Sequence, residues 1–280
     1  LKSFQSILTK NKKDLVLMIS KENGKCIFEA DLEVTAAINK VDLTIQAFEN
    51  KQLAQNLPTH LNSHKLSFKP IGLMVVLGPF NFPVHLPLGH ILPAILAGNC
   101  VILKPSEYVI GITKLLMLFF EQSSIMSDVV QCVYGSSYQA RYLISHSRIS
   151  GILFTGSYKT AQSISSYISR RPELLFAMEC GGNNPLVISS FKEQLHTIHS
   201  ILKSAYLTSG QRCTCARRLI VVDTVQNRQL IDSLIKAIEQ IKIADYKKNN
   251  IVNLGPLISE SSCVSALSFY DFLIKTGGIA

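Results

Sequence analysis

Apolar residues near the start of the chain recur at the spacing of amphipathic helices. From residue 2 to residue 20 they stand three or four positions apart, with an interruption near Asn11, and a second such pattern runs from Asp31 to Ala47. This spacing gathers apolar side chains on one helical face, so we predict helices over both stretches. The polar stretch from Asn50 to Ser67 has no such period and predicts a connector.

From residue 70 onward, short apolar runs alternate with helix-like stretches. The runs that predict buried strands are Leu73–Leu77, Cys100–Leu103, Val129–Tyr134, Gly151–Phe154 and Leu174–Met178. The stretches that predict the intervening helices are Leu86–Leu96, Tyr108–Gln122, Ser136–Ser145 and the residues after Ser157. This alternation indicates an α/β fold built on a Rossmann-type parallel sheet wound with helices.

The pattern restarts after Pro185. Strands are predicted at Leu186–Ile188 and Leu219–Val222, and helices at Gln194–Thr208, Gln226–Ile241 and Glu260–Lys275. We therefore expect a domain boundary near Gly181. Residues 1–180 would form the first domain, and residues 181–280 would form part of a second α/β domain.

Polar residues follow the predicted strands of the first domain. They are Asn81 in the turn Gly78–Pro83, the segment Lys104–Glu107, the pair Gly156–Ser157, and Glu179. Because the carboxyl ends of parallel strands meet at one edge of a sheet, and α/β folds bind nucleotides there, this edge is the predicted ligand site.

Two stretches carry groups suited to covalent catalysis. Glu179 precedes Gly181-Gly182, and Cys213 follows Gly210-Gln211. A cysteine attacks carbon as its thiolate, and a nearby carboxylate can accept a proton from water. The alternative is that Glu179 is a solvated loop residue and Cys213 an ordinary buried cysteine. These two stretches by themselves leave both interpretations open.

Composition narrows the class of protein. Hydrophobic residues make up 47% and charged residues 17% of the 280 residues, which is typical of a globular chain. The net charge of +9 is spread without a long basic run or interleaved aromatic residues, so nucleic-acid binding has no motif to support it. The apolar stretch from His85 to Leu103 contains prolines and two histidines, so we expect no membrane span.

Seven scattered cysteines form no disulfide framework and favour a reducing compartment, which we expect to be the cytoplasm. Cys213-Thr214-Cys215 lacks a second cysteine or histidine pair at ligand spacing, so no metal site is predicted. His85 and His90 lie five positions apart among prolines, and we assign both a structural role.

Five ordered motifs make the chain resemble the aldehyde dehydrogenase superfamily. They are Gly78-Pro79-Phe80-Asn81-Phe82-Pro83, Lys104-Pro105-Ser106-Glu107, Phe154-Thr155-Gly156-Ser157, Glu179 with Gly181-Gly182, and Gly210-Gln211-Arg212-Cys213. Within it, Gly89–Ala94, Gly181–Pro185 and Gly210–Arg218 resemble the branch that oxidises N-succinylglutamate 5-semialdehyde in arginine catabolism. The resemblance implies a small, anionic aldehyde substrate, and we expect the basic neighbourhood of Arg212 to suit its carboxylates.

The resemblance also implies roles for individual residues. Cys213 would attack the aldehyde, Asn81 and the Cys213 backbone N–H would form the oxyanion hole, and Glu179 would activate the water that hydrolyses a thioester. The residues themselves agree with these roles, because Arg212 adjoins Cys213 in the sequence and a nearby cation would favour the thiolate. Cys180 and Cys215 would be structural, since the family motif does not require them.

The implied cofactor is NAD. Lys104 and Glu107 would hold the adenine ribose, and Ser157, at a helix start, would lie near the pyrophosphate. The other residues that the resemblance assigns to cofactor binding are Phe80, Ser106, Gly156 and Gly181. A carboxylate at Glu107 would repel a 2′-phosphate, which favours NAD over NADP. Ala161 departs from the family pattern, which commonly has a second glycine at that position.

Family members are longer at both ends, so the resemblance covers only part of their fold. Their segment that grips the nicotinamide ribose and their strands that bridge subunits have no counterpart here. Two expectations therefore remain: an active dehydrogenase, or an inactive or split-gene fragment that at most binds NAD. A homo-oligomer is usual in the family, but the bridging strands are not in this chain.

Overall fold

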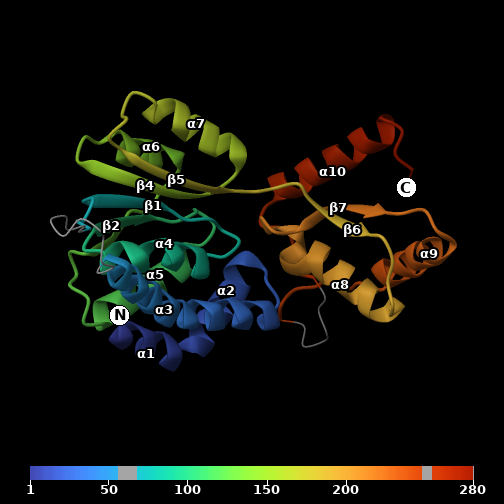
Figure 1. Cartoon of the computed structure of the whole chain (residues 1–280), viewed down its shortest axis with the longest axis horizontal. Helices are drawn as coiled ribbons and strands as arrows, with labels where there is room; N and C mark the ends of the chain where they lie inside the picture. The colour runs from blue at the N-terminus through green and yellow to red at the C-terminus, as the bar shows by residue number, and fades with distance from the viewer. Residues whose placement is uncertain (56–67, 248–253, 280) are drawn as a thin grey trace, which may run out of the picture. The chain divides into compact units, whose positions relative to one another are not determined.

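The computed structural model describes residues 1–55, 68–247 and 254–279 (Figure 1). The chain forms two compact units. The first contains Leu1–Glu22 and Ala30–Gly181, and the second contains Asn23–Glu29 and Gly182–Ala280. The segment Asn23–Glu29, which the sequence analysis placed in the first domain, therefore packs with the second unit.

The first unit is built on a five-stranded parallel sheet. Its strands are β1 (Leu73–Leu77), β2 (Cys100–Lys104), β3 (Val130–Cys132), β4 (Ile149–Gly156) and β5 (Leu175–Cys180). Their order is β3-β2-β1-β4-β5, and every neighbouring pair is parallel. The structure thus confirms the predicted α/β class with a parallel sheet wound with helices.

Helices cover both faces of this sheet (Figure 1). They are α1 (Lys2–Lys10), α2 (Lys12–Asn23), α3 (Ile27–Gln55), α4 (His85–Leu96), α5 (Ile110–Gln122), α6 (Ser137–Ser145) and α7 (Tyr158–Ile168). Met74 and Val76 of β1 pack into the cluster with α1–α5, whereas Val75 and Leu77 pack into the cluster with α6 and α7. Successive side chains point to opposite faces of a strand, so a continuous apolar run such as β1 supplies both clusters.

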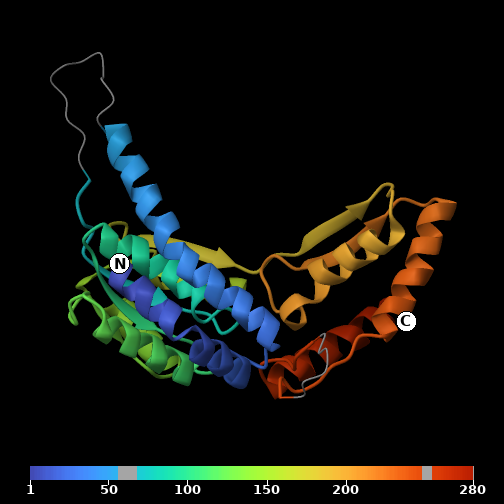
Figure 2. The same ribbon diagram turned by 90° about the horizontal axis from the view of Figure 1, so that it is seen from below.

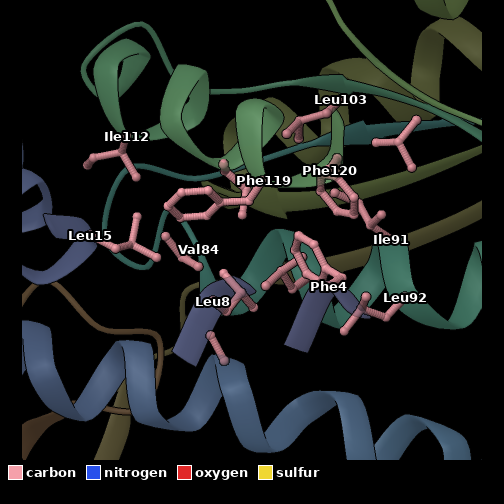
Figure 3. Close-up of a cluster of buried hydrophobic side chains, with 14 of the residues drawn as sticks. Phe4, Leu8, Leu15, Val84, Ile91, Leu92, Leu103, Ile112, Phe119 and Phe120 are labelled. Carbon is pink, nitrogen blue, oxygen red and sulfur yellow. The ribbon is translucent and has the colours of Figure 1, made fainter. Parts of the chain in front are cut away.

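The larger cluster joins the N-terminal helices to the sheet (Figure 3). Phe4 of α1 stacks on Phe120 of α5, with ring centroids 4.2 Å apart and planes 10° from parallel. Leu8 and Leu15 are fully buried in the same cluster. Burial of each such side chain contributes about 1.5–3 kcal/mol, so the first helices belong to the core of this unit.

The second unit contains a two-stranded parallel sheet, β6 (Asn184–Ile188) and β7 (Ala216–Val221). Leu186 and Ile188 pack against α8 (Gln194–Tyr206) and α9 (Val225–Glu239), which lie together beside the sheet (Figure 2). The next helix, α10 (Glu260–Lys275), has no buried residue. In the part of the chain that the structure describes, no helix combines the length and apolar character needed to cross a membrane.

Several element boundaries differ from the sequence predictions. Helix α3 continues to Gln55, so the predicted connector begins later, and residues 56–67 lie outside the described part of the chain. Strands β4 and β5 run further than predicted because pairing continues through Thr155↔Glu179 and Gly156↔Cys180. Gly156 therefore ends β4, and Glu179 lies within β5 one residue before its end, so neither residue occupies a turn. The predicted helix Gln194–Thr208 ends at Tyr206 and is followed by a short 3₁₀ turn, Leu207–Gly210.

Candidate functional site

The predicted cofactor residues of the first unit gather at the carboxyl edge of its sheet. Strand register pairs Leu77 with Lys104 on one side and with Phe154 on the other. One residue further along, Thr155 of β4 pairs with Glu179 of β5. The ends of β2, β1, β4 and β5 therefore reach the same edge, which is where open α/β sheets bind ligands.

Lys104 ends β2 as a buried residue. Burial lowers the pKa of its ammonium group, while the charges of Glu107 and Cys132 act in the opposite direction. Glu107 is exposed in the following turn, where the Ser106 carbonyl accepts a hydrogen bond from the Val109 amide at 3.3 Å. A cation and a carboxylate three residues apart offer a donor and an acceptor to hydroxyl groups, which fits a ribose.

Ser157 caps the N-terminus of α7. Its Oγ accepts a hydrogen bond from the Thr160 amide at 3.2 Å and lies 2.8 Å from Thr160 Oγ1. Unpaired amides at a helix start favour anions such as pyrophosphate. Gly156 precedes this cap, and a side chain there would overlap the Phe154 ring. Ala161 is fully buried in the core cluster beneath α7, so its methyl group fills space inside the unit.

The turn that carries Asn81 is fixed by a buried carboxylate on α3. Glu33, only 2% exposed, accepts hydrogen bonds from the Val84 amide at 3.0 Å and the His85 amide at 3.3 Å. These amides begin α4, whose N-cap residue makes no side-chain cap bond. Half-buried Asn81 itself accepts from the Phe82 amide at 3.0 Å. The carboxylate thus holds the chain just after Asn81, a role that the sequence analysis missed.

Glu179 is exposed at the end of β5, and His90 is its neighbour among titratable groups. His90 Nε2 lies 3.1 Å from the hydroxyl of Thr155, the residue paired with Glu179. Burial lowers the pKa of His90, the charge of Glu179 acts to raise it, and Lys40 lowers it further. His90, which the sequence analysis treated as structural, therefore belongs to the electrostatic surroundings of the candidate base.

In the second unit, Cys213 is exposed on the segment that leads into β7. The Asn184 side chain donates to the Cys213 carbonyl at 2.7 Å and to the Cys215 carbonyl at 3.0 Å. These bonds tie the cysteine segment to the start of β6. Cys215 is 2% exposed, so the two thiols differ in access to solvent. The difference favours Cys213 as the nucleophile and suits the structural role assigned to Cys215.

Arg212 directs its guanidinium group toward buried groups of its own unit. Its Nε donates to Thr208 Oγ1 at 2.8 Å, and its Nη2 lies 3.4 Å from Glu29 Oε1. The side chain of Glu29 is 2% exposed. This engagement weakens the expectation that Arg212 binds a substrate carboxylate. Arg217, four residues beyond Cys213 in β7, is exposed.

The predicted catalytic residues are distributed over both units. Asn81 and Glu179 belong to the first, whereas Cys213 belongs to the second. Gly181, an exposed residue with open space around the position of a side chain, ends the first unit. Among the described residues, no group of three or more His, Cys, Asp or Glu side chains could hold a metal ion.

Comparison with known proteins identifies the family. The family model for the aldehyde dehydrogenase family matches residues 1–278. The chain belongs to the aldehyde dehydrogenase family. It is 38% identical over 277 residues to the N-succinylglutamate 5-semialdehyde dehydrogenase of Legionella pneumophila strain Corby, and 37% identical over 276 residues to that of strain Paris. Each match covers 99% of this chain and 56% of the relative, so the chain spans little more than half of their length.

Solved structures show the same fold. The Y450L variant of the betaine aldehyde dehydrogenase of Staphylococcus aureus, in complex with NAD⁺, matches with a TM-score of 0.88 and 20% identity, over 99% of this chain and 56% of that one. An oxidoreductase from Marinobacter aquaeolei matches with a TM-score of 0.89 and 20% identity, over 98% and 58% respectively. The aldehyde dehydrogenase fold predicted from the five motifs is thus confirmed.

Proposed function

We propose that this chain carries the NAD-binding and nucleophile-bearing parts of an aldehyde dehydrogenase that oxidises an aldehyde to a carboxylic acid. The observation that carries the proposal is the contrast between exposed Cys213 and buried Cys215 on a segment tied to β6. Family membership supports it, and so does the collection of Lys104 and Glu179 at one sheet edge.

The covalent step is assigned to Cys213. Its thiolate attacks the aldehyde carbon, a carbon–sulfur bond forms, and the carbonyl oxygen becomes an oxyanion. Asn81 and the Cys213 amide are the proposed donors to that oxyanion. Loss of hydride from the same carbon leaves a thioester on Cys213.

Hydrolysis of the thioester is assigned to Glu179. Its carboxylate takes a proton from water, the hydroxide adds to the thioester carbon, and the carbon–sulfur bond breaks to release the acid and the thiolate. Exposure at the end of β5 gives Glu179 access to water. The lowered pKa of His90 keeps that imidazole neutral near neutral pH, so it does not compete as a cation for the carboxylate.

The residues at the sheet edge fit NAD. When bound, NAD supplies the acceptor for the hydride. Lys104 and Glu107 would hold the ribose hydroxyls, the amides after Ser157 would hold the pyrophosphate, and Phe80, Ser106, Gly156 and Gly181 would complete the site. The exposed Glu107 carboxylate would repel a 2′-phosphate, which favours NAD over NADP.

The proposed substrate is N-succinylglutamate 5-semialdehyde, and its oxidation is a reaction of arginine catabolism. Relatives of that name are 38% and 37% identical over nearly this whole chain. The substrate would be anionic. Seven free thiols among the described residues suit a reducing compartment such as the cytoplasm. We also propose a homo-oligomer, because homo-oligomers are usual in the family.

The test is NADH production by the purified 280-residue chain, given NAD and this semialdehyde. Turnover should disappear in Cys213→Ala and persist in Cys215→Ala, which is the matched control. Equal turnover in wild type and Cys213→Ala would refute the assignment.

A second candidate function is binding of NAD without turnover. The observation that favours it is α10, which exposes Leu267, Phe269, Phe272 and Leu273. Binding of NAD to a folded chain, measured by calorimetry, without any NADH production would support this alternative.

A further inference from the structure

The residues just before Cys213 adopt a backbone conformation that is rare for their types. Thr208 and Ser209 have φ values of 59° and 54°, and Gly210 follows with 72°. The left-handed region is unfavourable for non-glycine residues, and β-branched threonine is especially disfavoured there. Such conformations persist only where the surroundings hold them, so the contacts of this turn are informative.

Glu29 is the group that holds Thr208. Its Oε1 accepts from the Thr208 amide at 2.7 Å, lies 3.4 Å from Thr208 Oγ1, and lies 3.4 Å from Arg212 Nη2. Arg212 Nε also donates to Thr208 Oγ1 at 2.8 Å. A carboxylate that is 2% exposed needs this number of donors to remain in the interior. Cys26 Sγ lies 3.4 Å from the other carboxylate oxygen, Glu29 Oε2, so the side chains of Glu29, Thr208, Arg212 and Cys26 form one network beside the turn.

A second segment of the same unit binds the next residues of the turn. Ser209 Oγ donates to the Gly255 carbonyl at 2.7 Å, and the Ile258 amide donates to Gln211 Oε1 at 3.0 Å. Gly255 packs so closely on the Gly24 carbonyl that a side chain would overlap it. The segments around Gly24 and Gly255 thus support the turn together.

We propose that Glu29 is a positioning residue for the nucleophile. By fixing Thr208 in the left-handed region, it sets the direction in which the backbone enters Cys213, and with it the Cys213 amide and thiol. Without the carboxylate, Thr208 and Ser209 relax toward right-handed conformations and Arg212 loses its anionic partner. The inference deepens the proposed function and rests on it, because it takes Cys213 as the reacting group.

The test compares Glu29→Gln and Glu29→Ala in the full 280-residue chain. Hydrogen exchange of residues 207–215 reports on the turn whether or not the chain turns over. Glutamine keeps an acceptor for the Thr208 amide, so exchange should quicken about tenfold, whereas alanine should quicken it about a hundredfold. Glu33→Gln is the matched control: an equally buried glutamate on α3 that binds other amides, and it should leave this exchange unchanged.

Kinetics separate positioning from general destabilisation. Glu29→Ala should lower kcat for the semialdehyde at least tenfold with KM for NAD within about twofold, and Glu29→Gln should recover most of the loss. Peptide-resolved alkylation by iodoacetamide should slow at Cys213 at least threefold in Glu29→Ala, while exposed Cys263 is unaffected.

Two results would overturn the inference: wild-type exchange at residues 207–215 in Glu29→Ala, or an unchanged alkylation rate at Cys213. Absence of NADH from the wild-type chain would instead count against the proposed function, since exchange and alkylation still decide the role of Glu29. If circular dichroism shows that Glu29→Ala is unfolded, Glu29→Gln becomes the test variant. Faster hydrogen exchange of residues 207–215 in Glu29→Gln than in wild type would then support the inference, and wild-type exchange there would overturn it.

Discussion

Removal of Glu33 should loosen the start of α4 and the turn that carries Asn81. The carboxylate accepts hydrogen bonds from the Val84 amide at 3.0 Å and the His85 amide at 3.3 Å, and it is 2% exposed. Hydrogen bonds to a charged group contribute about 1.5–3 kcal/mol each, and their contributions overlap at one carboxylate. We therefore expect Glu33→Ala to lower the free energy of unfolding of the first unit by about 3–5 kcal/mol.

Glu33→Gln separates the effect of the negative charge of Glu33 from the effect of its side-chain shape. Glutamine keeps one acceptor oxygen and loses the attraction between a carboxylate and the positive end of a helix, so the expected loss is about 1–2 kcal/mol. The assay is urea unfolding followed by circular dichroism, together with hydrogen exchange at Val84 and His85. Because the chain has two units, a single unfolding transition does not report on one of them alone. Hydrogen exchange of the β1 amides therefore measures the stability of the first unit.

The control is Glu22→Ala. Glu22 accepts from the Gly111 amide at 2.7 Å and the Ile112 amide at 2.8 Å, at the start of α5, and is only half-buried. Glu22→Ala should lower the free energy of unfolding by less than Glu33→Ala does, and it should leave hydrogen exchange at Val84 unchanged. A Glu33→Ala loss below about 0.5 kcal/mol, within the range of ordinary surface substitutions, would refute the view that the carboxylate is essential to this turn.

Two further predictions concern titration and the core. The pKa of His90 should lie below its ordinary value, and it should fall further in Glu179→Gln, because that change removes the charge that raises it. NMR titration of the His90 side chain measures the pKa in the wild-type chain and in Glu179→Gln. A higher His90 pKa in Glu179→Gln than in wild type would contradict the assignment. Since folding lowers this pKa, the unfolded chain binds the proton first, so the His90 contribution to stability is complete above the unfolded pKa of about 6.5 and decreases as pH falls below it. Phe120→Ala should lower the free energy of unfolding by about 3–5 kcal/mol, because it leaves Phe4 facing a cavity, and a urea midpoint equal to that of wild type would contradict the stacking.

Hydrophobic periodicity was enough to predict the sheet of the first unit. Every strand of that sheet was found near its predicted place, because an apolar run bounded by glycine or proline has few other ways to bury itself. The ends were less accurate: Glu179 lies within β5, since its pairing with Thr155 is a property of two strands and not of one segment.

The motifs also predicted the family, but not what holds the catalytic segments. The left-handed conformation of Thr208 and Ser209 could not be predicted, because neither residue type favours it. The partner that stabilises it, Glu29, stands 179 residues earlier in the chain. Only tertiary contacts could reveal the pairing. The basic residues around Arg212 predicted a role toward substrate that the contact between Arg212 and Glu29 does not favour.

Periodicity is least informative about the glutamates of the first helices. A pattern of apolar and polar positions assigns charged residues to the solvent face, yet Glu29 and Glu33 are each 2% exposed and bind backbone amides of distant segments. The N-cap residue of α4, Val84, makes no side-chain cap hydrogen bond, so an acceptor from elsewhere must satisfy the first amides of the helix. A buried helix start without a local cap residue therefore implies a remote carboxylate, and the search for one should begin among the glutamates that a helical pattern would place on its polar face.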